Sequence, residues 1–254
     1  MSERQVDRTR LVAPASLHPR PEGFPDCTSC HYWSHGDPTV CFSCAASGAP
    51  AQSGSVCRLC RQHLVAGRCP NAVCNLPDPE FTHVWTVLER PEEMWSALWR
   101  YKYEEDKRWA RVLARLLIGF LDTNRDELEG YDAITTCALY VGPQATRLWD
   151  YLRLIVDEAQ RLGPQWPFVP DLIAKGVPTG RFMGIGVEER RTIAEGELRS
   201  ALTVPEPGRV RGKRVLVFDD VYSEGYSMRE MARVLRRAGA ADVDGLVLAR
   251  RKGC

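Results

Sequence analysis

Apolar residues recur at every third or fourth position in three stretches of the chain. This is the period of an amphipathic helix, whose apolar stripe faces a core. The stretches cover residues 91–122, 145–162 and 227–237. The first predicts two helices, or one helix bent near residues 104–106. Gly239 follows the third stretch, at the position where glycine commonly ends a helix.

Short runs of apolar and β-branched residues lie among the helical stretches. Such runs are typical of buried strands. They cover residues 131–141, 215–218 and 243–249. The last two flank the third helical stretch, so strand, loop, helix and strand form one right-handed parallel unit. This order of elements predicts an α/β fold with a parallel sheet flanked by helices.

Residues 163–211 carry the weakest pattern of the chain. They hold six prolines and several glycines, and they predict at most a short helix and a short strand. In a compact domain such a stretch usually contains a working loop or an edge element.

The composition is that of an ordinary globular protein. Of the 254 residues, 44% are hydrophobic and 26% are charged; this excludes a disordered or fibrous chain and suits one large or two modest domains. No apolar run approaches the roughly 20 residues that a membrane-spanning helix needs, and the N-terminus lacks the apolar part of a signal peptide. We therefore expect a cytoplasmic protein without membrane contact. The net charge of +1 gives no overall argument for nucleic-acid binding.

The cysteines divide the chain near residues 77–79. Eight of the ten lie between Cys27 and Cys74. We expect a disordered or extended N-terminus at 1–24, a double zinc-binding module like a zinc ribbon at 25–78, and an α/β domain at 79–254. Residues 1–80 hold seven Lys or Arg and seven Asp or Glu, which argues against a strong phosphate-binding surface on the module.

The cysteine spacing predicts two structural zinc ions. A C-x2-C turn holds two thiolates on one side of a loop, within reach of one tetrahedral ion, and a reducing cytosol disfavours disulfides. Sequential pairing is favoured over an interleaved cross-brace, and His31, His35 or His63 are alternatives for single positions. The sequential shells are Cys27, Cys30, Cys41 and Cys44, and then Cys57, Cys60, Cys69 and Cys74.

Two adjacent acids follow the strand predicted at 215–218. Asp219 and Asp220 stand at the carboxyl end of a parallel strand, where such sheets bind ligands. They can accept hydrogen bonds from a diol or hold a divalent ion, or one of them merely caps the helix or turn. The next loop opens onto a helix N-terminus, which suits a phosphate; Gly225 allows close approach, and the hydroxyls of Ser223 and Ser227 add donors. Together these residues suit a phosphorylated sugar.

The segment VLVFDDVYSEGYS, residues 215–227, resembles the phosphoribosyl pyrophosphate motif of type I phosphoribosyltransferases. The cysteine knuckles, the segment LWRYKYEEDKRWARVLARLL, the segment GVEERR and the closing VLRRAGAADVDGLVLARR extend the likeness. Over most of residues 27–252 the chain resembles the ComF family of competence-associated proteins. The resemblance implies a type I phosphoribosyltransferase-like sheet, magnesium, and phosphoribosyl pyrophosphate or a related ribose phosphate as ligand.

The resemblance also implies roles for single residues. Asp219 and Asp220 would hold the ribose hydroxyls at the catalytic centre, and Arg190 and Arg191 are candidates for the pyrophosphate. At position 224 the family has Thr or Ser, whereas a carboxylate beside a phosphate dianion weakens binding by about 1 kcal/mol or more through repulsion. The phosphate loop would comprise Ser223, Glu224, Gly225, Tyr226 and Ser227.

Two functions of different classes follow from these observations. One is magnesium-dependent transfer of a phosphoribosyl group from phosphoribosyl pyrophosphate to a nitrogenous acceptor, with activity that Glu224 weakens or alters. The other is a non-enzymatic accessory role in competence or DNA processing. In that role the zinc module and a basic C-terminal segment bind single-stranded DNA or a protein partner. The sequence leaves the acceptor and the oligomeric state open.

Overall fold

The computed structural model of the chain describes residues 55–88, 95–145 and 149–251. The predictions for residues 1–24 and for the first cysteine shell lie outside the described residues. That shell is Cys27, Cys30, Cys41 and Cys44. Within the described part, no helix combines the length and the apolar character needed to cross a membrane.

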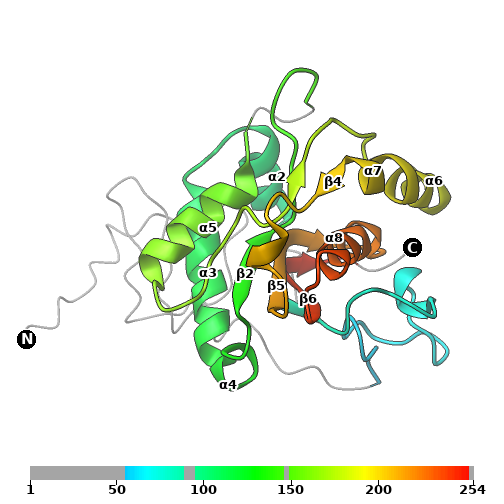
Figure 1. Ribbon diagram of the computed structural model, residues 1–254, viewed down its shortest axis with the longest axis horizontal. Coiled ribbons are helices and arrows are strands. Elements are labelled where there is room, and N and C mark those ends of the chain that lie inside the picture. The colour runs from blue at the N-terminus through cyan, green and yellow to red at the C-terminus, as the bar shows by residue number, and fades with distance from the viewer. Residues whose placement is uncertain (1–54, 89–94, 146–148, 252–254) are drawn as a thin grey trace, which may run out of the picture.

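A four-stranded parallel sheet forms the centre of the molecule (Figure 1). The strand order is β1-β6-β5-β2, and each neighbouring pair runs parallel. The central strands β5 and β6 are buried along most of their length, which explains their nearly continuous apolar sequences. The predicted parallel α/β architecture is confirmed. The strands are β1 (Val84–Leu88), β2 (Ala133–Thr136), β5 (Arg214–Tyr222) and β6 (Asp242–Arg250).

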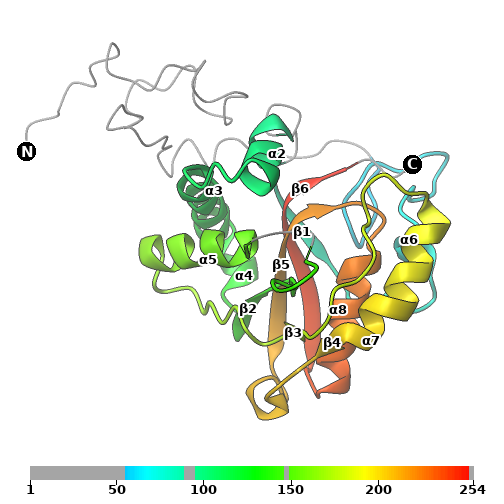
Figure 2. The same ribbon diagram turned by 90° about the horizontal axis from the view of Figure 1, so that it is seen from above.

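Helices cover both faces of this sheet, with α3, α4 and α5 on one side and α8 on the other (Figure 2). The described part of the stretch at 91–122 contains two helices, and Glu105, with a φ of 55°, lies in the break between them. The third predicted helix ends as expected, because Gly239 adopts a φ of 99°. The helices are α2 (Trp95–Tyr103), α3 (Trp109–Thr123), α4 (Arg125–Leu128), α5 (Tyr151–Leu162) and α8 (Tyr226–Arg237).

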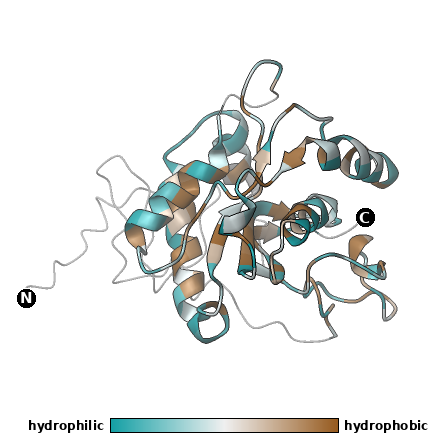
Figure 3. Cartoon of the chain, viewed as in Figure 1, coloured by the Kyte–Doolittle hydropathy of each residue, from teal (hydrophilic) through white to brown (hydrophobic). Residues whose placement is uncertain are grey.

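The region that the sequence left least defined contains a long helical run. It consists of α6 (Val187–Ile193), the π-helical η5 (Ala194–Leu198) and α7 (Arg199–Ala201). This run is longer than the short helix predicted. No residue of α6 is buried, and α6 shows few hydrophobic residues (Figure 3). Without an apolar stripe, the helix left no periodic signal in the sequence.

Several short elements complete the described chain. An antiparallel pair, β3 (Ala174–Lys175) and β4 (Leu202–Thr203), brackets the long helical run. Two short 3-10 helices, η3 (Val73–Asn75) and η6 (Pro207–Arg209), lie before β1 and before β5. Of these elements, η3 lies beside the loop that follows β5, since the backbone N–H of Val73 donates to the carbonyl of Glu224.

Three strand boundaries differ from the predictions. The edge strand β1 was not predicted, and β2 occupies only 133–136 of the run at 131–141. Strand β5 extends through Tyr222 instead of ending at Phe218, because it keeps pairing with β6 as far as Arg250. The acid doublet therefore lies inside a strand and close to its carboxyl end.

Candidate functional site

Asp220 lies in a nearly closed environment on β5. Its side chain is 5% exposed, and Lys102 of α2 donates a hydrogen bond from Nζ to Oδ2. The Tyr151 hydroxyl of α5 lies 3.3 Å from Oδ1. A carboxylate this buried needs such partners to remain charged, so Asp220 is already engaged by two helices.

Asp219 has a different environment, although it is the next residue. It is half-buried, and its Oδ1 accepts a hydrogen bond of 2.8 Å from the backbone N–H of Asp220. Burial and the charge of Asp220 raise the pKa of Asp219 to about 7. The two acids therefore differ in exposure and in their hydrogen-bond partners.

The loop after the doublet contains an ion pair at Glu224. Arg190 of α6 donates from Nη1 to both carboxylate oxygens, at 2.7 and 2.9 Å. Burial alone would raise the pKa of Glu224, but the Ser223 hydroxyl and the Arg190 guanidinium outweigh it, so the pKa lies below its ordinary value. The carboxylate is charged at neutral pH, and Arg190 compensates its charge.

Gly225 shapes the start of α8. It adopts a left-handed φ of 93° as the residue that precedes the helix, and no described side chain caps the first turn. A Cβ at this position would overlap the Tyr222 hydroxyl and lie 3.1 Å from Cβ of Val73. Only glycine fits here, and the first N–H groups of α8 point out of the helix end, where an anion is favoured.

The structure brings the predicted phosphate loop together. Ser223, Glu224 and Gly225 form a bend, and Tyr226 and Ser227 begin α8. Both serines are half-buried, whereas the other three residues are buried. Neither acid of the doublet caps α8, so the helix-capping alternative for Asp219 and Asp220 does not hold.

The second predicted cysteine shell is assembled. The Sγ atoms of its four members all lie within 4.8 Å of one another, as sequential pairing requires, and His63 is exposed outside the cluster. Four thiolates about 2.3 Å from one tetrahedral ion would lie about 3.8 Å apart; the Cys60 and Cys69 sulfurs are 3.6 Å apart. The members are Cys57, Cys60, Cys69 and Cys74.

The donors around the cluster also suit a metal site. Asn71 donates to the Cys60 sulfur from its side-chain amide at 3.2 Å and to the Cys69 sulfur from its backbone at 3.4 Å. The thiols do not ionise independently, since a hydrogen bond from Cys74 lowers the pKa of Cys60 while burial raises that of Cys69. A cation would favour four thiolates together. The residues present fit a metal ion such as zinc.

This cluster adjoins the loop at residues 223–227. The backbone N–H of Val73 donates to the carbonyl of Glu224 at 3.2 Å, and the Cys74 sulfur lies 3.5 Å from the Tyr222 hydroxyl. Arg250 at the end of β6 donates to the carbonyl of Cys60. The cysteine knuckles and the loop are therefore held in direct contact.

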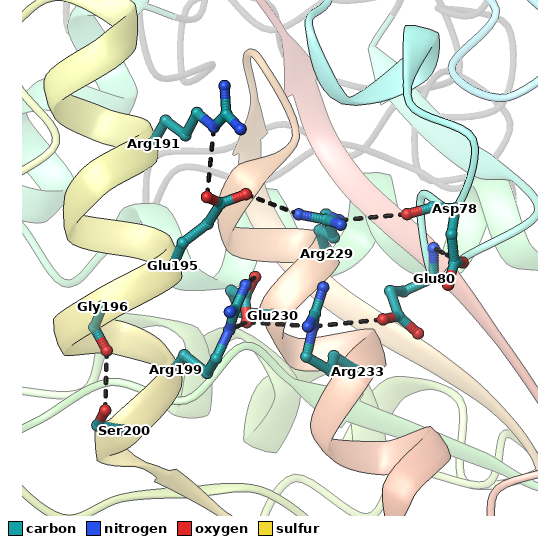
Figure 4. A network of polar contacts seen from close by, with 10 residues as sticks. All are labelled: Asp78, Glu80, Arg191, Glu195, Gly196, Arg199, Ser200, Arg229, Glu230 and Arg233. Carbon is teal, nitrogen blue, oxygen red and sulfur yellow. Dashed lines mark hydrogen bonds and ion pairs between the residues drawn. The ribbon is translucent and has the colours of Figure 1, made fainter.

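An ion-pair network fixes the helical run against α8 (Figure 4). Glu195 pairs with Arg229 at 2.9 Å, and Arg199 donates two hydrogen bonds, of 2.8 and 2.9 Å, to the carboxylate of Glu230. Glu195 also accepts from Arg191 at 3.3 Å, so this arginine lies in the network and not on the loop. Of the two candidate arginines, only Arg190 contacts the loop at residues 223–227, through Glu224.

Two residues at the site were missed by sequence reasoning. Lys102 and Tyr151 belong to helices distant in sequence from the doublet, so no local pattern linked them to it. A weak signal existed in the YKY segment, where Lys102 sits between two tyrosines of an amphipathic helix. Because a lysine on a helix is usually solvated, that signal does not predict a buried partner.

The chain has distant relatives among characterised sequences. No protein-family model matches it. The chain is 25% identical over 227 residues to the DNA utilization protein YhgH of Escherichia coli strain K12, covering 88% of this chain and 89% of that protein. The proteins of the same name from Shigella flexneri and E. coli O157:H7 match with the same identity and coverage.

Solved structures with a similar arrangement include three enzymes. The glutamine phosphoribosylpyrophosphate amidotransferase of B. subtilis shows 23% identity and a TM-score of 0.31 over 56% of this chain, which spans only 25% of that one. The purine phosphoribosyltransferase of Pyrococcus horikoshii Ot3 shows 16% identity and a TM-score of 0.34, covering 57% of this chain and 86% of that one. The hypoxanthine phosphoribosyltransferase of Staphylococcus aureus shows 9% identity and a TM-score of 0.33, covering 57% of this chain and 65% of that one. The superpositions are loose, so the architecture rests on this chain's own strand order and register.

Proposed function

We propose that this chain is a phosphoribosyltransferase-like protein that binds phosphoribosyl pyrophosphate or a related ribose phosphate at the end of β5. One observation carries the proposal. The acid doublet of β5 is followed within a few residues by the left-handed Gly225 and the uncapped N-terminus of α8. Acceptors for ribose hydroxyls and donors for a phosphate therefore lie next to each other on one continuous segment.

The donors of the loop fit a 5-phosphate. Backbone N–H groups at the start of α8 and the hydroxyls of Ser223 and Ser227 are the groups that hold phosphates in such loops. Magnesium would arrive with the diphosphate, whose charge it neutralises. If the protein is an active enzyme, it transfers the phosphoribosyl group to a nitrogenous acceptor, and positioning of the diphosphate supplies most of the rate enhancement.

Arg190 changes what Glu224 is expected to do. A bare carboxylate in this loop would repel a phosphate dianion, but the bonds of 2.7 and 2.9 Å from Arg190 cancel its charge locally. The same guanidinium is then occupied by an internal anion, so a ligand phosphate competes with Glu224 for it. We therefore expect weak binding in the wild type.

Calorimetric titration of phosphoribosyl pyrophosphate with magnesium tests this proposal. We expect the wild type to bind with a Kd in the micromolar to millimolar range. Glu224→Thr should bind about tenfold tighter, and a tenfold change in Kd corresponds to about 1.4 kcal/mol. Glu189→Thr is the matched control, because Glu189 is exposed on α6, and it should bind as the wild type does. Absence of binding in both the wild type and Glu224→Thr would overturn the proposal.

We also propose that the four described knuckle cysteines hold a structural zinc ion, and that the four earlier cysteines hold a second. The ions fold a segment that is too small to fold alone. Elemental analysis should find two zinc ions per chain and one in Cys60→Ser. Since reduced thiols are required, we expect the protein to act in the cytoplasm.

A role in DNA handling is the second candidate. It is favoured by the E. coli relative, which is named a DNA utilization protein. Several arginines of the basic C-terminal segment are engaged in the described structure: Arg229 with Glu195, Arg233 with Glu80, and Arg236 with Asp242. Titration of a single-stranded oligonucleotide at low and high salt decides this candidate, and absence of binding at low salt removes it.

A further inference from the structure

We propose that Lys102 is a positioning residue and that, because it pairs with only one acid of the doublet, the two acids have different roles. It holds Asp220 as part of the scaffold, and it leaves Asp219 as the acid that meets the ligand's hydroxyls. The inference rests on the proposed function for the ligand, but the Lys102–Asp220 half can be tested without any ligand.

The strand itself separates the two acids. Both belong to β5, and Asp219 pairs in register with Val247 of β6. Neighbouring residues of a strand point to opposite faces of the sheet. Asp219 and Asp220 therefore cannot share one set of side-chain partners, and whatever engages one acid leaves the other differently placed.

Lys102 reaches Asp220 from an enclosed position. Its side chain is 13% exposed, against 5% for Asp220. The Nζ atom lies 4.9 Å from the centre of the Tyr151 ring and 5.8 Å from that of Tyr103, distances at which an ammonium is attracted to the ring face. The cation is thus held by aromatic rings as well as by the carboxylate.

Tyr151 ties this arrangement to the helical layer. Its hydroxyl lies 3.3 Å from Asp220, and its backbone carbonyl accepts a 2.7 Å hydrogen bond from the hydroxyl of Tyr101 in α2. Tyr101 and Tyr151 are both buried, and their rings meet edge to face. Because α2 and α5 are locked together at this point, the lysine is fixed where it meets Asp220.

The neighbours of Asp219 are of another kind. The negative charge of Asp220, the next residue on the strand, acts on Asp219 electrostatically. The thiol of Cys137, which follows β2, also interacts with Asp219. Lys102 acts on Asp219 only through its field, while Lys175 acts on Cys137. None of these described groups pairs Asp219 with a cation as Lys102 pairs Asp220.

The net charge around the doublet determines whether it binds a metal ion or a sugar hydroxyl. Two unpaired, ionised carboxylates would attract a divalent ion, but Lys102 pairs with Asp220, so even when both acids are ionised the three groups together carry a charge of only −1. A half-buried carboxylate beside a neutralised partner suits a neutral donor such as a sugar diol. The structure therefore favours hydroxyl recognition by Asp219 over direct metal binding by the pair.

The first test measures coupling through stability and needs no ligand. Chemical denaturation of Lys102→Met, Asp220→Asn and the double variant should show a loss in the double variant clearly smaller than the sum of the single losses. Lys107→Met is the matched control: Lys107 lies exposed between α2 and α3, and its Nζ atom is 5.3 Å from the centre of the Trp149 ring. Its combination with Asp220→Asn should be additive. Additive losses for Lys102 as well would overturn the proposal.

The second test follows ligand binding against pH. Binding of phosphoribosyl pyrophosphate should fall at least tenfold in Asp219→Asn at pH 8. In Lys102→Met the pH midpoint of binding should rise, because without the cation the pair keeps a proton to higher pH. Lys102→Arg should restore the wild-type midpoint. A weakened Lys102→Met with an unchanged midpoint would show a merely structural role and overturn the proposal.

The two tests fail separately. If the wild type binds no ligand at any pH, the proposed function and the role of Asp219 are overturned, whereas the stability cycle still reports on Lys102 and Asp220. If the wild type binds ligand but the cycle is additive, the proposed function stands and the positioning role of Lys102 falls.

Discussion

Glu224 illustrates at the scale of one residue how a departure from a motif is accommodated. A buried carboxylate in a phosphate loop would be unfavourable alone. Here Arg190 supplies two hydrogen bonds from a helix that lies more than thirty residues earlier in the chain. The departure in the loop and the arginine in α6 are therefore two halves of one local arrangement, and neither is understood without the other.

The left-handed backbone of Gly225 leads to a prediction about the stability of the protein. Gly225→Ala places a Cβ at a φ of 93°, against the Tyr222 hydroxyl and Val73, and we expect the free energy of unfolding to fall by roughly 2 kcal/mol or more. Gly196→Ala is the matched control. Its Cβ would meet no atom within 4 Å, so in a helical run it should be neutral or gain up to about 1 kcal/mol. Urea denaturation compares the two variants, and an equal effect would contradict the steric argument.

The raised pKa of Asp219 leads to a prediction about how the stability of the protein depends on pH. In the unfolded chain its pKa is about 3.9, whereas in the folded protein it is about 7. Between these values the folded protein keeps a proton that the unfolded chain has released, so stability falls as the pH rises through this window and is flat above it. Asp219→Asn removes the effect and should gain roughly 1 to 4 kcal/mol relative to wild type between pH 4 and pH 8. Parallel stability curves for the two proteins would contradict it.

At the scale of elements, ion pairs add to a small apolar contact in the run from α6 to α7, in which Ala194, Leu198 and Ala201 are buried. The side chain of Glu230 is 1% exposed and receives both Arg199 and Arg233. This contact anchors α7 on α8 and so keeps Arg190 of α6 above the loop. Sequence periodicity identified α3, α5 and α8, which bury apolar stripes. It did not identify the run at 187–201, because charge pairs between distant segments have no period.

Arg199→Met tests this anchoring. It removes the bidentate partner of Glu230, and we expect a loss of about 1–2 kcal/mol. This is less than for a fully buried pair, since Arg199 is 32% exposed and Arg233 remains 3.5 Å from Glu230. Arg191→Met is the control, because Arg191 is 49% exposed, and it should leave the free energy of unfolding nearly unchanged. Denaturant midpoints of the two variants give the answer, and equal values would count against the anchor.

For the whole molecule, the described cysteine cluster belongs to the core of the α/β fold. Cys57, Cys60, Cys69 and Val73 are buried in the same cluster of apolar side chains as the sheet. The backbone N–H of Val84 at the start of β1 also donates to the carbonyl of Leu59 at 2.7 Å. The knuckles therefore support the edge of the sheet and the phosphate loop together.

Metal removal should consequently destabilise more than the knuckles. With a strong zinc chelator we expect one cooperative transition whose midpoint falls on the order of 10 °C or more, since 1 kcal/mol shifts a domain of this size by about 2–4 °C. Circular dichroism at helical wavelengths follows it. Cys137→Ser, in a buried thiol outside the cluster, should leave the zinc content unchanged. A chelated protein with an unaltered helical transition would show that the cluster folds independently.

The sequence by itself determined the elements whose signal is local. The apolar periods gave the main helices and the parallel unit around β5, and the C-x2-C spacing with the segment after Asp219 gave the candidate site. Only the tertiary structure decided that Lys102 pairs with Asp220, that Arg190 pairs with Glu224, and that β5 carries the doublet within it. Those outcomes depend on the burial of charges between segments distant in the chain, and burial is a property of the packed molecule that no local spacing encodes.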